Sequence, residues 1–377
     1  MTGKKHALLG ASSSERWLNC PPSLRLCEDF PDFGSSYAAE GTAAHELCEH
    51  KLKSALGIPT KDPTPDLTYY NSEMEYCANE YATYILEIVE AAQSPQVLIE
   101  QRVEYSRWAT EGFGTADCIV IADGILHVID YKHGKGVQVE ADSNSQMMLY
   151  ALGALELFDS LYDIESVSMT IFQPRRNNIS TSMLTKESLY KWADEVLRPA
   201  AELAWNGEGE FRCGDWCKFC KAKAVCKKRA DVNMELARHE FAEPALLSDS
   251  EIAAILPQID DLIGWGSDLK DYALQQALRG STFDGFKVVE GRSNRRYTDE
   301  TAVADKVKAL NLNPYEPPKI LGITAMTSLL GGKKKFDTTL DGLVTKPAGK
   351  PVLVPDSDKR EAINTAATDF SEPIADQ

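Results

Sequence analysis

The sequence has no run that approaches the ~18 apolar residues a helix needs to span a bilayer. Its first residues, Met1 to Lys5, lead into polar chain without the apolar core of a secretory signal. It also lacks a Walker A sequence, so we expect no fused helicase motor. Together these absences predict a cytoplasmic protein that does not bind membranes.

An excess of basic residues is missing too. The chain has 40 Lys and Arg against 57 Asp and Glu, a net charge of -17. This balance argues against a protein that coats nucleic acid with its whole surface, but an enzyme with a local basic groove remains compatible with it. The apolar fraction of 43% is ordinary, and 377 residues favour two domains over one.

Apolar periodicity predicts a mixed α/β core, with helices and strands alternating along the chain. Asp123-Gly124 between two apolar runs predicts a two-residue hairpin turn. The predicted helices span 38–56, 72–92, 144–158 and 186–205, and the predicted strands span 97–103, 119–122, 125–129 and 167–172.

Three regions follow from changes in composition. Residues 1–230 form the core with a cysteine cluster, and residues 231–285 form a helical segment. Residues 286–377 form a C-terminal α+β extension, in which 286–290 and 295–297 are expected to pair as a hairpin before a polar tail.

Two carboxylates and a lysine flank the predicted hairpin. Asp117 precedes the first strand, Asp130 ends the second, and Lys132 leaves the same face as Asp130. Hard cations prefer such oxygen ligands, so the pattern predicts a Mg²⁺ or Mn²⁺ site for phosphate chemistry, with Lys132 stabilising negative charge. Glu100 could add a ligand or hold an attacking water, and His45 suits Mn²⁺.

Each of these residues also has an ordinary structural interpretation. Asp117 could end a turn, and Asp130 with Lys132 could form a surface ion pair of little energetic value. His45 could be a core or surface histidine. Gln146 and Tyr150, one turn apart on a predicted helix, could serve packing alone.

Taken in order, five motifs resemble the RecB-like branch of the PD-(D/E)XK nucleases, which includes the RecB and AddB nuclease domains and CRISPR-associated spacer-acquisition nucleases. The motifs are Gly41-x-x-x-His45, Glu100, Gly114-Thr-Ala-Asp117, Asp130-Tyr-Lys132 and Gln146-x-x-x-Tyr150. The resemblance covers roughly residues 10 to 230 and implies a restriction-endonuclease-like fold, a central mixed sheet flanked by helices. It further implies that His45, Asp117 and Asp130 bind metal, that Lys132 is catalytic, and that Gln146 and Tyr150 contact the active site or DNA. Glu104, on the same predicted strand face, competes with Glu100 for its role.

Four cysteines, Cys213, Cys217, Cys220 and Cys226, fall within a short stretch. Their spacing suits one structural Zn²⁺, or a [4Fe-4S] cluster in which Cys20 joins Cys217, Cys220 and Cys226. The resemblance favours the cluster, because iron–sulfur members of the branch have one cysteine before the His motif and three after the core. Cys27, Cys48, Cys77 and Cys118 are expected to be core thiols.

The resulting expectation is a metal-dependent deoxyribonuclease, an exonuclease on double- or single-stranded DNA ends. The resemblance extends to phage or prophage recombination exonucleases that supply an annealing protein, which would place the chain in a bacterial host cytoplasm. Two rivals remain, an inactive nucleic-acid-binding scaffold of this fold and an iron–sulfur sensor. DNA contacts are expected from basic groups that lie beside the site, beside the cysteines and in the C-terminal region: Lys132, His133, Lys135, Lys218, Lys221, Lys223, Arg292, Arg295, Arg296 and Lys333 to Lys335.

Overall fold

The computed structural model describes residues 7–30, 36–237, 249–289, 299–309, 315, 320 and 322–344. A five-stranded mixed sheet forms its centre, in the order β1-β2-β3-β4-β5. Neighbouring strands are antiparallel except β3 and β4, which are parallel and are joined by the crossover helix α5. The strands are β1 Gln96–Glu104, β2 Phe113–Ala122, β3 Ile125–Tyr131, β4 Ser166–Gln173 and β5 Asn178–Thr185.

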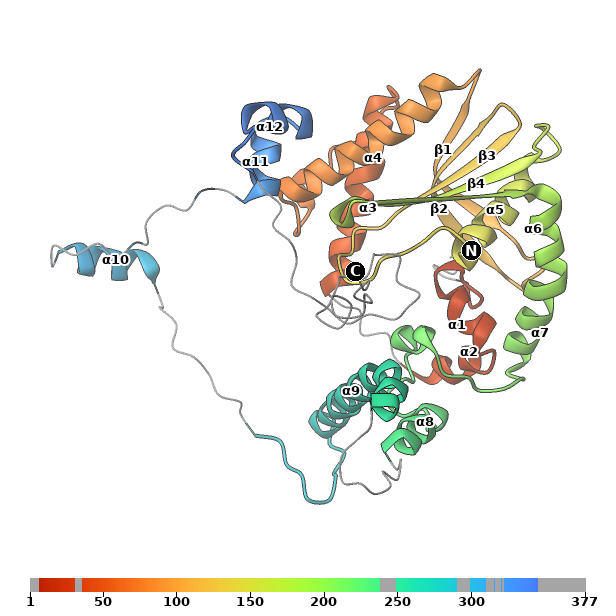
Figure 1. Cartoon of the computed structure of the whole chain (residues 1–377), viewed down its shortest axis with the longest axis vertical. Helices are drawn as coiled ribbons and strands as arrows, with labels where there is room; N and C mark the ends of the chain where they lie inside the picture. The colour runs from red at the N-terminus through yellow and green to blue at the C-terminus, as the bar shows by residue number, and fades with distance from the viewer. Residues whose placement is uncertain are drawn as a thin grey trace, which may run out of the picture.

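Helices cover both faces of this sheet (Figure 1). One face packs on α5 with α1, α6 and α7, and the other packs on α3 and α4. The predicted mixed α/β core is therefore confirmed. The core helices are α1 Ser14–Asn19, α2 Ser23–Leu26, α3 Ser36–Ala55, α4 Ser72–Ala91, α5 Ser145–Phe158, α6 Lys186–Trp192 and α7 Arg198–Asn206, and the later ones are α8 Lys227–Ala237, α9 Asp249–Leu278, α10 Glu300–Lys308, α11 Ile323–Leu329 and α12 Lys333–Thr339.

Local sequence explains where these elements begin and turn. The Asn71 side chain accepts a hydrogen bond from Met74 N and caps α4, and Asn144 caps α5 in the same way. At the β2–β3 hairpin, Asp123 and Gly124 both have left-handed φ angles, of 51° and 75°. Both central residues of a type I′ turn need that conformation, so the predicted hairpin is confirmed.

The predicted helix 186–205 contains a change of winding. Between α6 and α7, residues Ala193–Leu197 form a π-helical turn, and Pro199 stands in the first turn of α7. A proline has no N–H to donate to the preceding turn, so an uninterrupted α-helix would lose a hydrogen bond there. The π turn shifts the hydrogen-bond register just before that point.

The structure differs from the sequence prediction in two places. The first is strand β5, which was not predicted, and the second is the C-terminal hairpin. Over the described residues 286–289 the expected strand is not formed, and those residues meet no strand in the described part of the chain; an isolated hairpin is marginal in water. Its second half, like Arg292, Arg295, Arg296 and the polar tail, lies outside the described residues. In the ranges that are described, no helix is long and apolar enough to cross a membrane.

Candidate metal centre

A break in the regular alternation of β1 and β2 positions two of the carboxylates. Glu100 has a left-handed backbone, with φ at 52°, inside a strand. Ile99 packs against α3 and α4, whereas Val103, which regular alternation would put on the same side, packs on the α5 face. A non-glycine residue in this conformation is strained, and such strain is concentrated at functional sites.

The same break lies across the ladder in β2. The pairs Ile99↔Cys118 and Gln101↔Ala116 flank Glu100 and Asp117, which therefore stand opposite each other. Asp117 thus belongs to the middle of a strand ten residues long, whereas the sequence placed it before a shorter one.

His45 joins these two carboxylates from α3. One ligand atom each from His45, Glu100 and Asp117 lies within 4.8 Å of the others. His45 Nδ1 is 3.2 Å from Asp117 Oδ1, and the backbone N–H of Tyr131 donates to Asp117 Oδ2 at 2.7 Å. The three residues are held by three separate elements. Glu104 does not belong to the group, because it is the last residue of β1 and pairs with Arg102.

Asp130 and Lys132 form the second half of the site, on the α5 side of β3. Lys132 Nζ lies 2.8 Å from Asp130 Oδ2 and donates to Gln146 Oε1 at 3.1 Å. Gln146 Nε2 donates to Asp130 Oδ1 at 3.1 Å, and Tyr150 Oη lies 3.0 Å from the same nitrogen. Gln146 therefore orients both the carboxylate and the lysine, and Tyr150, one helical turn later on the predicted shared face of α5, contacts Gln146.

The charges of the two halves influence one another. Burial lowers the pKa of His45, but the Asp117 carboxylate outweighs it, so the pKa rises to about 9. Burial, and then the charge of Asp117, raises the pKa of Glu100 to about 7. Burial also raises the pKa of Asp130, with Asp117 adding to the rise and Lys132 opposing it. The site thus holds several acidic groups at an electrostatic cost.

These residues fit a divalent cation. Asp130 Oδ2 is buried and lies 2.8 Å from the Lys132 ammonium, its ion-pair partner. One imidazole with nearby carboxylates is a donor set suited to Mn²⁺ and, through its oxygens, to Mg²⁺. A cation held by His45, Glu100 and Asp117 would reduce the repulsion between the carboxylates, and Asp130 is not part of that group.

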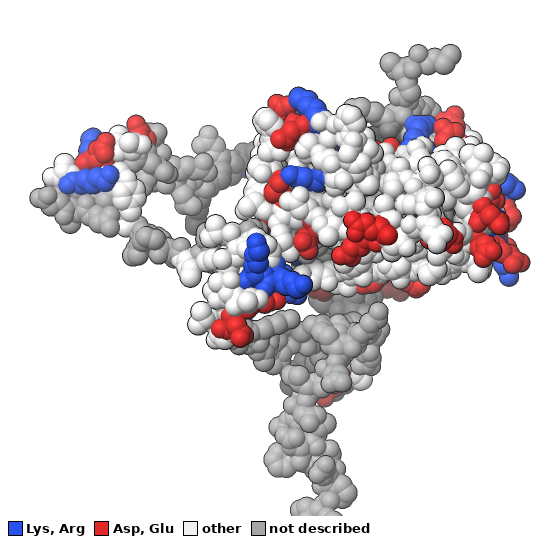
Figure 2. Space-filling view, turned by 90° about the horizontal axis from the view of Figure 1, so that it is seen from above, with Lys and Arg blue, Asp and Glu red and all other residues white. Residues whose placement is uncertain are grey.

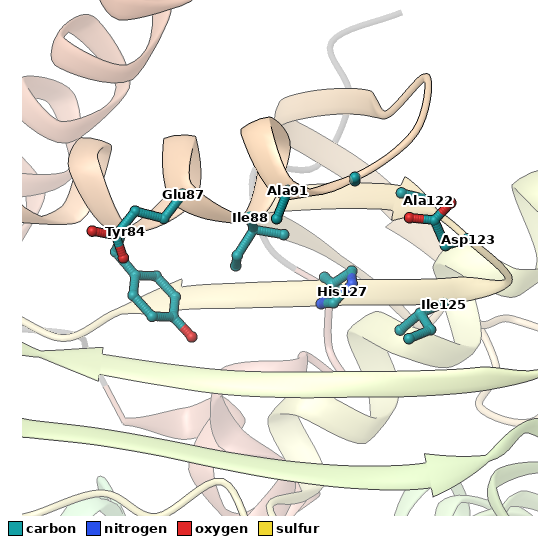
Figure 3. A pocket seen from close by; sticks show the side chains of 9 residues that line it. Tyr84, Glu87, Ile88, Ala91, Ala122, Asp123, Ile125 and His127 are labelled. Atoms are coloured by element: carbon teal, nitrogen blue, oxygen red, sulfur yellow. The ribbon is translucent and has the colours of Figure 1, made fainter.

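A hollow of about 370 Å³ lies at the opposite end of β3. Figure 3 shows Tyr84 and Ile88 of α4 above Ile125 and His127 of β3. The lining is mainly apolar, and burial lowers the pKa of His127. Glu87 and Asp123 also line this hollow, but none of the described lysines does, so it lacks the pairing of carboxylates with a lysine that makes the metal centre a candidate for chemistry.

A family model described as a protein of unknown function, DUF2800, matches residues 6–361. The chain belongs to the DUF2800 family. Among solved structures, "Crystal structure of SSO0001" is similar at 16% identity over 48% of this chain and 94% of that chain, with a TM-score of 0.20. A TM-score this low carries no argument about fold or function.

The cysteine group of this DUF2800 protein joins the start of the chain to its middle. Cys20, Cys217 and Cys220 are buried, and Cys226 is partly exposed. Burial raises the pKa of Cys217, and the neighbouring Cys20 and Cys226 add to the rise. Tetrahedral zinc at ~2.3 Å would hold four sulfurs about 3.8 Å apart. Among the described residues, no three thiols come within 4.8 Å of one another.

Sequence reasoning missed the position of Cys27. It is buried, as expected of a core thiol, but its sulfur lies 3.6 Å from Cys220 Sγ and accepts from Arg16 Nη1 at 3.6 Å. The Cys220 thiol, acting as donor, lowers the pKa of Cys27 to about 5. Its place seven residues after Cys20, with a short helix between them, was the available signal.

A partly buried ionic network beside the metal centre was also missed. Arg175, which follows β4, pairs with Glu40 of α3 and with Glu73 of α4 at 2.9 Å each. His133 Nε2 lies 3.3 Å from Glu40, and its Nδ1 is 2.8 Å from Tyr131 Oη. The network fastens the segment after Lys132 to both helices. The expectation that His133 contacts DNA is wrong, because its side chain is only 4% exposed.

Proposed function

We propose that this DUF2800 protein is a divalent-metal-dependent deoxyribonuclease of the RecB-like PD-(D/E)XK type. The observation that carries the proposal is the chain of contacts Asp130–Lys132–Gln146 beside the group His45, Glu100 and Asp117. An isolated surface ion pair would not need a second residue to orient its lysine. Here an amide bridges the carboxylate and the ammonium, which is the support expected for groups that must hold a fixed geometry.

In this proposal Asp117, Asp130 and His45 hold Mg²⁺ or Mn²⁺, and Glu100 adds a ligand or holds the attacking water. Such an ion supplies an activated water and polarises the scissile phosphate. The remaining groups act without it: Lys132 places its ammonium where negative charge develops on the phosphate, and Gln146 fixes the direction of that ammonium. Burial raises the pKa of Tyr150 well above its usual range, so its hydroxyl remains a neutral hydrogen-bonding group.

We infer linear DNA, double- or single-stranded, as the substrate, and a single-strand annealing protein as a partner, both on the family resemblance. On the face shown in Figure 2, Lys and Arg side chains lie in several separate groups among acidic ones, so contacts with phosphates would be local. Two lysines near the cysteines are already paired, Lys218 with Asp215 and Lys223 with Asp268. Lys333 to Lys335 in α12 are exposed and are the better candidates for phosphate contacts.

The test is an assay on end-labelled linear and closed circular DNA, with Mg²⁺, Mn²⁺ or EDTA. We expect degradation of the linear substrate only, dependent on the cation and abolished in Asp130→Asn. Glu104→Gln is the matched control, since its carboxyl lies on β1 but outside the site. A pure wild-type protein that binds DNA but cuts neither substrate with either cation would instead favour the inactive scaffold.

We further propose that Cys20, Cys217, Cys220 and Cys226 hold a [4Fe-4S] cluster, with zinc on Cys213, Cys217, Cys220 and Cys226 as the alternative. Among the described residues no three thiols lie within 4.8 Å of one another, as one zinc ion would require, and a four-iron core spans a wider space. Protein purified without oxygen should be brown and absorb near ~400 nm. Colourless protein with stoichiometric zinc would favour the alternative.

A further inference from the structure

Helix α9 exposes an apolar stripe. Along this helix Ile252, Leu256, Ile263, Leu274 and Leu278 are between 40% and 62% exposed. They are separated by intervals of four, seven or eleven residues, which are close to whole turns of an α-helix, so they lie along one side of α9. Surface helices normally turn such a stripe toward a core, and this one does not.

Helix α8 lies beside α9 (Figure 1) and is joined to it by ion pairs. Arg229 of α8 donates to Asp261 Oδ1 at 2.8 Å and to Asp268 Oδ2 at 2.7 Å. At 3.6 residues per turn these two aspartates lie about a third of a turn around the helix from the centre of the stripe. The ion pairs therefore fix α9 to α8 and leave the apolar stripe facing outward.

The stripe is nearly symmetric about Trp265. Ile252 lies thirteen residues before this tryptophan and Leu278 thirteen after it, while Leu256 and Leu274 are nine residues away on either side. If a second copy of α9 ran antiparallel with its midpoint at the same residue, each of these side chains would meet an apolar partner. A two-fold axis requires this self-complementary arrangement.

The polar residues of the same side obey the same symmetry. Asp260 and Lys270 are each five residues from Trp265, and both are exposed. Within the described chain neither makes an ion pair, whereas across the two-fold axis each would face the opposite charge. Ile263 would meet Ser267, whose hydroxyl already donates to the Ile263 carbonyl and so adds no unsatisfied donor.

We propose that α9 is a homodimerisation helix that pairs antiparallel with α9 of a second copy of this chain. Gly264 and Gly266 flank the axis, and nothing lies within 4 Å of a Cβ built at Gly266, so the backbones can approach closely there. The five exposed side chains leave roughly 450 Å² per chain, so the pair covers at most about 900 Å², which is smaller than a standard specific interface. The dimer is accordingly one that dissociates on dilution.

The test is the mass of the full chain by light scattering over a range of concentrations. We expect the mass to move from the 41.6 kDa of one chain toward twice that value as concentration rises. Ile263→Asp should hold the chain at the monomer mass. Leu269→Asp is the matched control, because Leu269 is 40% exposed on the same helix but outside the stripe, and it should dimerise like the wild type.

Charge reversal gives a second, independent readout. Asp260→Lys and Lys270→Asp should each weaken the dimer several-fold, and the double variant should restore it, because opposite charges again face each other. Circular dichroism of every variant guards against misfolding. Three results would each overturn the proposal. The wild type could stay at 41.6 kDa at all concentrations, the Leu269→Asp control could behave like Ile263→Asp, or the double variant could dimerise more weakly than either single variant.

Discussion

Replacing Glu100 with glutamine should stabilise the metal-free protein while weakening metal binding. In the folded chain the pKa of Glu100 rises from an ordinary 4.5 to about 7, through burial and then the nearby Asp117 carboxylate. An acid whose pKa rises on folding weakens the fold only when it is ionised. The penalty is absent below about pH 4.5, grows as pH rises toward 7 and is complete above 7. Glutamine keeps the shape and removes the charge.

The magnitude follows from that difference in pKa. Taken in full it corresponds to about 3 kcal/mol. Because Glu100 is only partly buried, solvent screens its charge, and we expect Glu100→Gln to raise the free energy of unfolding by about 1–2 kcal/mol at pH 8. The left-handed backbone at this position is common to both proteins, so its strain cancels in the comparison.

Urea unfolding in EDTA at pH 8 measures this difference, and the same experiment at pH 4 should show none. With Mn²⁺ at ~100 times its Kd, the wild type gains about 2.7 kcal/mol, whereas the variant, lacking a ligand, gains less. The order of stability should therefore reverse on adding metal. Glu104→Gln, exposed beside Arg102, should change nothing in either condition. A Glu100→Gln protein that is less stable than the wild type in EDTA at pH 8 would refute the reasoning.

Three further outcomes are expected. Lys132→Met should lower the rate of DNA cleavage by a factor of ~10²–10³, while the metal affinity, measured by calorimetry, changes little. The control Lys135→Met should retain most activity, because the Lys135 ammonium is exposed and pairs with Glu73. Cys220→Ser should abolish the absorbance near ~400 nm, whereas loss of bound metal in Cys213→Ser would favour zinc. Arg175→Met should lower the free energy of unfolding by about 1–3 kcal/mol in urea, because Glu40 loses its ion pair with the arginine and Glu73 keeps only Lys135. An unchanged free energy of unfolding would contradict the role assigned to the network.

The sequence carried enough information for the hairpin and for the side-chain faces of β3. Asp123-Gly124 set the register, and period-two alternation put Asp130 and Lys132 on one side. Strand β5 was not predicted because its alternation of apolar and polar residues is inverted. Ile179 and Met183 are exposed, while Ser180 and Ser182 turn inward to Glu140 and Asp142. An edge strand with this composition gives periodicity no apolar face to detect.

Other parts of the site could not be read from local sequence for a different reason. The left-handed backbone of Glu100 runs against the preference of its residue type and is imposed by the strands around it. Arg175 meets Glu40 across more than a hundred residues of chain, a pairing that no spacing rule reaches. Cys27 likewise meets Cys220 only because the folded chain brings its beginning back to its middle.

Three features of the metal centre that are unfavourable in a protein without a ligand coincide there. The backbone of Glu100 is strained, burial and then the nearby Asp117 carboxylate raise the pKa of Glu100 to about 7, and burial raises the pKa of Asp130 although Lys132 lies 2.8 Å away. Each one separately has ordinary explanations. A divalent cation would reduce the last two costs together. The strained backbone of Glu100 interrupts the strand alternation, and this interruption lets β1 present a carboxylate toward α3 and β2. A bound cation would offset the electrostatic costs at Glu100 and Asp130 together, which an exposed ion pair between Asp130 and Lys132 would not do.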